Sequence, residues 1–267
     1  MGRCVVAVSV SVETGGGGAE QASGVARIAK RRGSRISPTG QRRDRGRPYD
    51  GVVADATRPT VLLTAFESFG GAVRNPSWDA AQRLAETWDG PADLAVERLP
   101  VVFAETRARL AAAVVEHRPT VVVATGLAAG RSAVNPERVA VNVLDARIPD
   151  NAGAQPVDEP IDPNGPATAF STLPIKRIVR DVRAAGVPAS VSNTAGTFTC
   201  NQAFYELMSL AAQGGFRAGF VHVPATPDTA GDGPAIGLDD IVTALDAVVR
   251  ASIDPAPDIV EQGGAES

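Results

Sequence analysis

Cysteine and histidine are scarce in this chain of 267 residues, which contains only two of each. Cys4 and Cys200 lie far apart and form no disulfide framework, which fits a reducing compartment. Two histidines and one cysteine beyond the N-terminal region make no zinc-binding pattern, so we expect no metal. The sequence also lacks a run of 18 apolar residues, a Walker A sequence and a GxGxxG sequence. We therefore expect no transmembrane helix, no membrane partner and no nucleotide-binding loop.

A large overall excess of one charge is missing, since the formal net charge is only −4. Residues 1–58 nevertheless carry 11 Lys or Arg against 5 Asp or Glu, and they are rich in Gly, Arg and Ser with few aromatics. This composition predicts a disordered basic extension. Two alternatives are a basic arm that contacts RNA or DNA and a short signal peptide with residues 4–12 as its core. No cleavage site follows that core, and we expect no nucleic-acid partner.

Buried strands alternate with amphipathic helices from residue 59 onward. We expect strands at 59–66, 93–101, 119–126, 187–193 and 216–224. Helices are expected at 104–117, 171–186 and 237–252, with one more that Asn75 caps and one that Cys200 opens. Residues 137–167 predict a strand or hairpin that runs into a long loop.

This alternation predicts an α/β fold, with an open, twisted, mostly parallel sheet and helices on both faces. The result is a three-layer α/β/α sandwich. We expect the domain to span residues 59–253 and a flexible C-terminal tail to follow at 254–267.

Cys200 and His222 are the candidate reactive groups, because ligands of open α/β sheets bind outside the carboxyl ends of the strands. Cys200 begins a helix, where the dipole and free N–H groups favour a thiolate. His222 ends the strand in "GFVHVP", whereas His117 ends a helix and needs only a structural role. A thiolate and a histidine base suit nucleophilic catalysis. An inert buried thiol and a hydrogen-bonded core histidine remain alternatives.

A carboxylate that orients such a histidine cannot be chosen from spacing alone. Five candidates lie in the middle of the chain: Glu137, Asp145, Asp150, Asp158 and Glu159. Glu137 differs from the others because it directly precedes an apolar strand. At that position it either faces the site or caps the strand.

Several motifs resemble those of the type I pyroglutamyl peptidases, cysteine peptidases that remove an N-terminal pyroglutamyl residue. They occur in order between residues 60 and 252 and read "VLLTAFESFGG", "NPSW", "GLAAGR", "NPERVAVNV", "ARIPDN", "FSTLPIK", "SNTAGTFTCN" and "GFVHVP". The resemblance implies that Cys200 is the nucleophile, His222 the general base and Glu137 the third member of the triad. It also implies that Arg147 lies near the active site.

The resemblance further implies the substrate pocket and the setting of the enzyme. Phe66 and Phe69 match the phenylalanines of the family's pyrrolidone pocket, Phe198 belongs to the same neighbourhood, and Asn75 also matches. A flat, neutral lactam fits between aromatic faces. The family pattern implies pyroglutamyl peptides as substrates, no cofactor, a cytoplasmic location and a homotetramer.

The chain departs from the family pattern at a few positions. Ala65 replaces a glycine and Ser68 a proline, Gln202 stands where histidine is common, and the 225–236 loop differs. Ala65 is tolerable only at negative φ. These departures keep a second hypothesis open, in which a same-fold protein of little or no activity binds a small lactam-like metabolite.

Overall fold

The computed structural model describes residues 58–264 of the chain. The basic extension predicted for residues 1–58 therefore lies, except for Arg58, outside the described residues. The domain boundaries at 59, 253 and 254 stay predictions.

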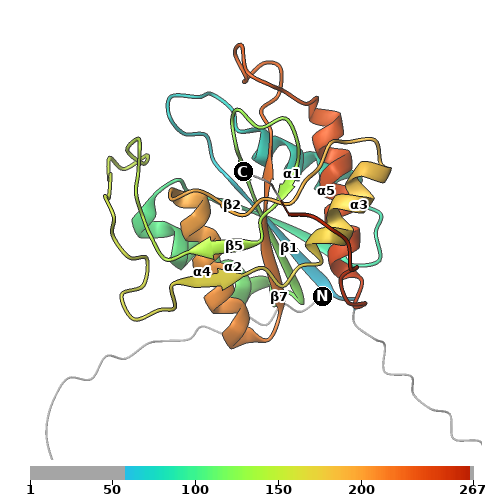
Figure 1. Ribbon diagram of the computed structural model, residues 1–267. Coiled ribbons are helices and arrows are strands. Elements are labelled where there is room, and N and C mark those ends of the chain that lie inside the picture. The colour runs from blue at the N-terminus through green and yellow to red at the C-terminus, as the bar shows by residue number, and fades with distance from the viewer. Residues whose placement is uncertain (1–57, 265–267) are drawn as a thin grey trace, which may run out of the picture. The chain divides into compact units, whose positions relative to one another are not determined.

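A five-stranded sheet in the order β2-β1-β3-β7-β4 forms the centre of the domain (Figure 1). Its strands are β1 (Thr60–Phe66), β2 (Asp93–Leu99), β3 (Val121–Leu127), β4 (Asn135–Pro136) and β7 (Arg217–Val223). The first four in sheet order pair in parallel, and only the short β4 is antiparallel to its neighbour. The predicted mostly parallel sheet is confirmed.

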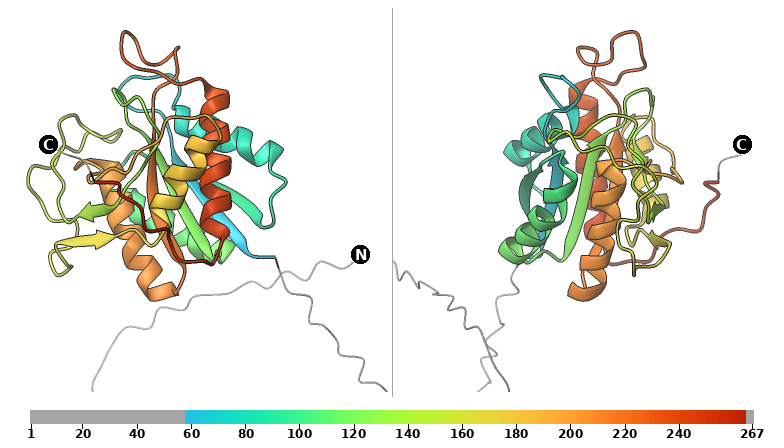
Figure 2. Two further views of the ribbon diagram at one scale, coloured as in Figure 1. Left: turned by 45° about the vertical axis from the view of Figure 1, so that its right-hand side comes forward. Right: turned by 90° about the vertical axis from the view of Figure 1, so that its left-hand side faces the viewer.

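Helices cover both faces of this sheet (Figures 1 and 2). One layer contains α1 (Pro76–Thr87), α3 (Ile175–Ala184) and α5 (Leu238–Ile253), and the other contains α2 (Phe103–His117) and α4 (Thr199–Gly214). Successive strand residues point to opposite faces. Leu63 of β1 accordingly packs in the first layer's core and Leu62 in the second's. The three-layer sandwich is thus confirmed.

A second, two-stranded sheet packs against α4. It pairs β5 (Val139–Val141) with β6 (Thr168–Phe170), and the long loop expected in this region runs between them. The Asn201 side-chain amide of α4 donates to the carbonyls of Val141 and Val143 and accepts from the Val141 N–H. These bonds fix the start of that loop beside the helix that carries Cys200.

The strand predicted at 187–193 is wrong. This segment forms only single bridges, Ala189 with Val134 and Ser192 with Glu137. Pro188 contributes to the reason, because proline has no N–H to continue a ladder; its carbonyl still accepts from the Val134 N–H at 2.9 Å.

The C-terminal segment from Asp254 to Gly264 runs back to the start of α3. Asp258 accepts the main-chain N–H groups of Lys176 and Arg177 at 3.0 and 2.9 Å. Within residues 58–264, no helix is long and apolar enough to cross a membrane.

Candidate active site

His222 and Glu137 form a buried pair at the carboxyl edge of the sheet. His222 is next to last in β7, and its Nδ1 lies 2.7 Å from Glu137 Oε1. Glu137 directly follows β4, where its main-chain N–H donates to the Phe220 carbonyl at 2.8 Å. The Glu137 side chain has no solvent exposure. The sequence left open whether the Glu137 carboxylate faces the site or caps the strand. In the structure it faces His222.

Cys200 lies at the same edge, as the second residue of α4. Its thiol packs on Gly126 of β3, and Gly126 is the register partner of His222. A Cβ at Gly126 would lie 2.9 Å from Cys200 Sγ and 3.0 Å from Phe220 Cζ, so only glycine leaves room for the thiol. The thiol makes no hydrogen bond to His222 within residues 58–264. Both side chains therefore border one strand position without being bonded to each other.

The surroundings favour a neutral thiol and a neutral imidazole. Burial raises the pKa of Cys200 to about 12, the Glu137 charge adds to this increase, and the Arg131 charge opposes it. Burial also lowers the pKa of His222, against the opposing effect of Glu137. Desolvation at this position thus opposes the thiolate that the helix start favours, because burial disfavours the charged form.

A neutral His222 has a definite tautomer in this geometry. A carboxylate oxygen can only accept a hydrogen bond, so the neutral imidazole donates its Nδ1–H to Glu137 Oε1 and keeps a lone pair on Nε2. Such an imidazole can take a proton from a thiol.

Aromatic side chains pack in the same core cluster as Cys200. Phe66 is 2% exposed, and its Cδ2 lies 3.4 Å from the same Gly126 Cβ position that borders the sulfur. The rings of Phe69 and Phe198 lie 6.2 Å apart, and Phe103 meets Phe198 edge-on at 5.2 Å. Phe103 was not found from the sequence, where it directly precedes the helix expected at 104–117. These rings offer flat apolar faces beside Cys200.

The Asn75 side chain forms hydrogen bonds within the protein. It is 3% exposed, caps α1 through the Ser77 N–H, and donates to the Glu67 carbonyl at 2.8 Å. It therefore fixes the loop that carries Phe69. A contact between Asn75 and substrate stays a prediction.

Arg147 is exposed and makes no hydrogen bond or ion pair within the described part of the chain. The structure does not join it to the His222–Glu137 pair. Two residues earlier, the main chain of Asp145 bonds both the carbonyl and the hydroxyl of Thr197, at 3.0 and 2.7 Å. The segment of Arg147 is thus fixed near the turn that leads to Cys200.

Arg131 is hydrogen-bonded to the His222–Glu137 pair, and its sequence position alone did not mark it as a site residue. Its Nη1 donates to Glu137 Oε1 at 2.8 Å, and its Nη2 donates to the Thr194 carbonyl at 3.1 Å. It stands in the "GLAAGR" motif, six residues before Glu137 and in a loop at the carboxyl edge. That position was the only available indication of its role.

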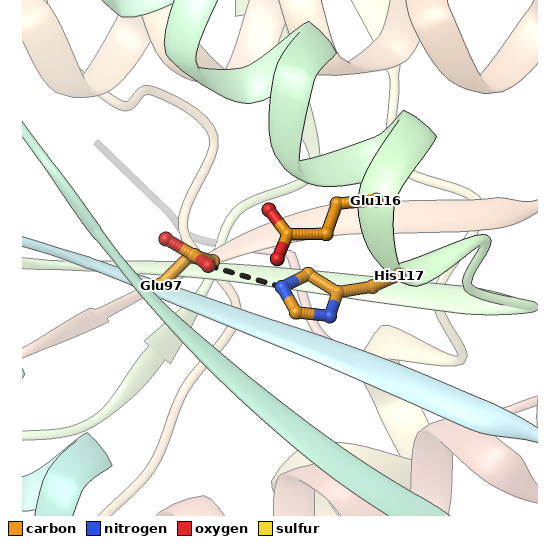
Figure 3. A group of neighbouring side chains, drawn as sticks. All are labelled: Glu97, Glu116 and His117. Carbon is orange, nitrogen blue, oxygen red and sulfur yellow. Dashed lines mark hydrogen bonds and ion pairs between the residues drawn. The ribbon is translucent and has the colours of Figure 1, made fainter. Parts of the chain in front are cut away.

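One group of side chains within residues 58–264 has the composition of a cation site: Glu97, Glu116 and His117 (Figure 3). Glu97 already pairs with His117, at 3.0 Å, and with Arg109, so its charge is compensated. Glu97 lies on β2, and β1 and β3 separate that strand from the strand of His222. The group is therefore not part of the Cys200 site.

A cysteine beside a histidine that a buried glutamate orients is the arrangement of a cysteine-type hydrolase. Its place at the carboxyl edge of a parallel sheet is the usual one for α/β enzymes. The fold and the site together define this class.

The family model described as pyroglutamyl peptidase matches residues 59–255. The chain belongs to this family.

Individual relatives agree with this family assignment. A pyrrolidone-carboxylate peptidase of Clavibacter michiganensis subsp. michiganensis is 52% identical over 210 residues, which cover 78% of this chain and 99% of that protein. The crystal structure of pyroglutamyl peptidase I from Bacillus amyloliquefaciens superposes with a TM-score of 0.74 at 44% identity, covering 77% of this chain and all of that one. The pyrrolidone carboxyl peptidase from Thermococcus litoralis has the same TM-score at 34% identity, covering 76% and 99%.

Proposed function

We propose that this cysteine peptidase removes N-terminal pyroglutamate from peptides, with Cys200 as nucleophile, His222 as general base and Glu137 as the group that orients the base. The observation that carries the proposal is the juxtaposition at Gly126. The thiol packs on that glycine, whose register partner is the histidine bonded to Glu137 at 2.7 Å. The peptidase names of the relatives indicate the bond that is cleaved.

The first step follows from the two neutral partners. His222 Nε2 accepts the thiol proton as Sγ attacks the pyroglutamyl carbonyl carbon, so charge develops only during the reaction. The imidazolium then gives its proton to the departing amine, which leaves a thioester on Cys200. Water, deprotonated by His222, hydrolyses this acyl-enzyme and restores the thiol. Glu137 stabilises the imidazolium in both halves of the cycle.

Two groups can stabilise the oxyanion. The main-chain N–H of Cys200 lies in the first turn of α4, where N–H groups have no partner within the helix. Arg147, whose segment is fixed against Thr197, supplies a positive charge once substrate draws the side chain in. The roles of both groups are part of the proposal.

The aromatic side chains account for the choice of a lactam. Phe66, Phe69 and Phe198 present apolar faces to a flat, neutral ring. An open-chain glutamate would bring a charge into the same space, and an unpaired charge in an apolar site is costly. The alternative of an inactive metabolite binder is not favoured by the relatives, whose names are those of peptidases.

The homotetramer and the cytoplasmic location belong to this proposal as well. They rest on the family resemblance and on the scarcity of cysteine, which suits a reducing compartment.

The experiment measures release of a fluorescent amine from a pyroglutamyl amide by the reduced, full-length protein. The wild-type protein should be active, and Cys200→Ser should lower kcat by roughly a thousandfold or more. The matched control is Cys4→Ser, which removes the only other cysteine and should keep wild-type activity. Equal activity in wild type and Cys200→Ser would exclude the proposed nucleophile, and folded but inactive wild type would favour the metabolite-binding alternative.

A further inference from the structure

The carboxylate of Glu137 is a charge with no exposure to solvent. A buried charge is costly unless other charges and hydrogen bonds compensate it. Burial lowers the pKa of His222 and so disfavours a positive charge on its imidazole. Arg131 is the cation at this carboxylate, with Nη1 2.8 Å from Oε1. Arginine stays protonated throughout the pH range of the enzyme, so this compensation is permanent.

The second arm of Arg131 reaches the segment that leads to the nucleophile. Nη2 donates to the Thr194 carbonyl at 3.1 Å, between the bridge at Ser192 and the start of α4. One guanidinium therefore connects the acid that orients the base to the turn that delivers Cys200. Its planar, fixed donors suit two partners at set directions.

The charge of Arg131 also acts on the reacting groups. It opposes the increase in the pKa of Cys200 and contributes to the decrease in the pKa of His222. The ionisable groups that act on His222 are Glu137 and Arg131, with the Cys200 thiol at the start of α4 as the third group at this edge. A positive charge here keeps the imidazole free to act as a base at lower pH.

We propose that Arg131 is a positioning residue of the catalytic apparatus, which holds the Glu137 carboxylate directed at His222 and fixes the turn before Cys200. This role rests on the proposed function. Arg131 acts through Glu137 and Thr194 and makes no contact with the reacting bond.

The test compares Arg131→Met, Arg131→Gln and Arg131→Lys in the full-length protein, with kcat, KM and the pH dependence of kcat/KM as readouts. Arg138→Met is the matched control. It also removes an arginine that bonds the segment before α4, through Asn193 Oδ1 at 2.8 Å, but one without a bond to Glu137. Circular dichroism at the assay temperature establishes which variants are folded.

The Met and Gln variants should lose roughly 10- to 100-fold in kcat with little change in KM, the usual effect of removing a partner that orients a functional side chain. The acidic limb of their kcat/KM–pH profile should move to higher pH, because loss of the Arg131 charge raises the pKa of His222. Arg131→Lys keeps the charge, so its acidic limb should stay in place while kcat falls less. Arg138→Met should behave as wild type.

Wild-type kcat and an unmoved acidic limb in either folded neutral variant would overturn the role of Arg131. The same loss in Arg138→Met would also overturn it, by assigning the effect to the loop alone. If Arg131→Met does not fold, Arg131→Gln tests the role of Arg131, since it keeps an N–H donor without the charge. If neither variant folds, Arg131→Lys provides the test. Active wild-type protein with unaffected variants refutes only this inference, whereas inactive wild-type protein refutes the proposed function and this role with it.

Discussion

At Cys200, two physical effects oppose each other. The start of α4 offers a dipole and free N–H groups that favour a thiolate. Burial against Gly126 and the nearby charge of Glu137 favour the thiol and raise its pKa to about 12, against the opposing charge of Arg131. In the proposed mechanism, His222 removes this proton as attack occurs. The position at a helix start therefore marks Cys200 as a candidate nucleophile, while its burial, which only the tertiary structure shows, acts against the thiolate.

A direct consequence concerns alkylation of the free enzyme. Cys200 should react slowly with iodoacetamide near pH 7, and the rate should continue to rise above pH 9, because the folded-state pKa of about 12 exceeds the ordinary cysteine value of about 8.5. The measurement is the alkylation rate against pH in Cys4→Ser, which leaves one thiol. A fast reaction that reaches a plateau below pH 7 would instead indicate a preformed thiolate–imidazolium pair.

Among the elements, α4 carries Cys200 at its start and, further along, a buried polar pair of Gln202 and Glu206, which lie four residues apart. Gln202 Nε2 donates to the Phe103 carbonyl at 2.9 Å and to Glu206 Oε1 at 3.3 Å. The first bond joins α4 to the start of α2, where Phe103 contacts Phe198. The departure at Gln202 is thus accommodated by a specific contact. Ala65, another departure, lies within β1 at a φ outside the left-handed region, as its side chain requires.

Glu206 makes the stability of this helix depend on pH. Burial raises its pKa to about 7, while Gln202 and Arg107 lower it. The folded state therefore holds the proton more tightly than the unfolded chain, in which the pKa is about 4.3. The resulting stabilisation is complete below about pH 4 and is lost as the pH rises through 7.

Glu206→Gln should consequently unfold at a higher urea concentration than wild type at pH 8, by up to roughly 3 kcal/mol in unfolding free energy. The difference should shrink as the pH is lowered toward 5. Exposed Glu86→Gln on α1 is the control and should show neither effect. A wild-type protein as stable as Glu206→Gln at pH 8 would show that this carboxyl ionises without cost.

At the scale of the whole domain, the segment after α5 connects two helices of one layer. Pro174, the residue before α3, provides no side-chain cap. Asp258, which lies 84 positions later in the chain, caps the helix instead by accepting the N–H groups of Lys176 and Arg177. Arg177 pairs with Asp254 at 2.8 Å and donates to the carbonyls of Ala256 and Pro257. This cap satisfies N–H groups that every helix start leaves free.

Asp258→Ala should lower the unfolding free energy by about 1 kcal/mol, the typical value of a helix cap. For a domain of this size, that corresponds to a decrease of roughly 2–4 °C in Tm. Glu261→Ala is the matched control in the same segment, because only the main-chain carbonyl of Glu261 bonds Lys176. Equal Tm values for the two variants would mean that the cap contributes nothing in solution.

The sequence by itself determined what depends on neighbours in the chain. Apolar runs placed the strands, Asn75 and Pro76 placed the start of α1, and the alternation of elements put Cys200 and His222 at one edge of a parallel sheet. The exception was 187–193, where a strand-like composition does not pair continuously because pairing depends on a distant partner.

Only the tertiary structure decided the contacts between distant residues. It bonded Glu137 to His222, brought Arg131 to the same carboxylate, and joined Asp258 to α3. It also determined the direction of the pKa shifts of Cys200 and His222. The physical reason is the same in each case: burial and charge compensation arise from side chains that meet only after the sheet and its two helical layers have assembled, and no local pattern encodes them.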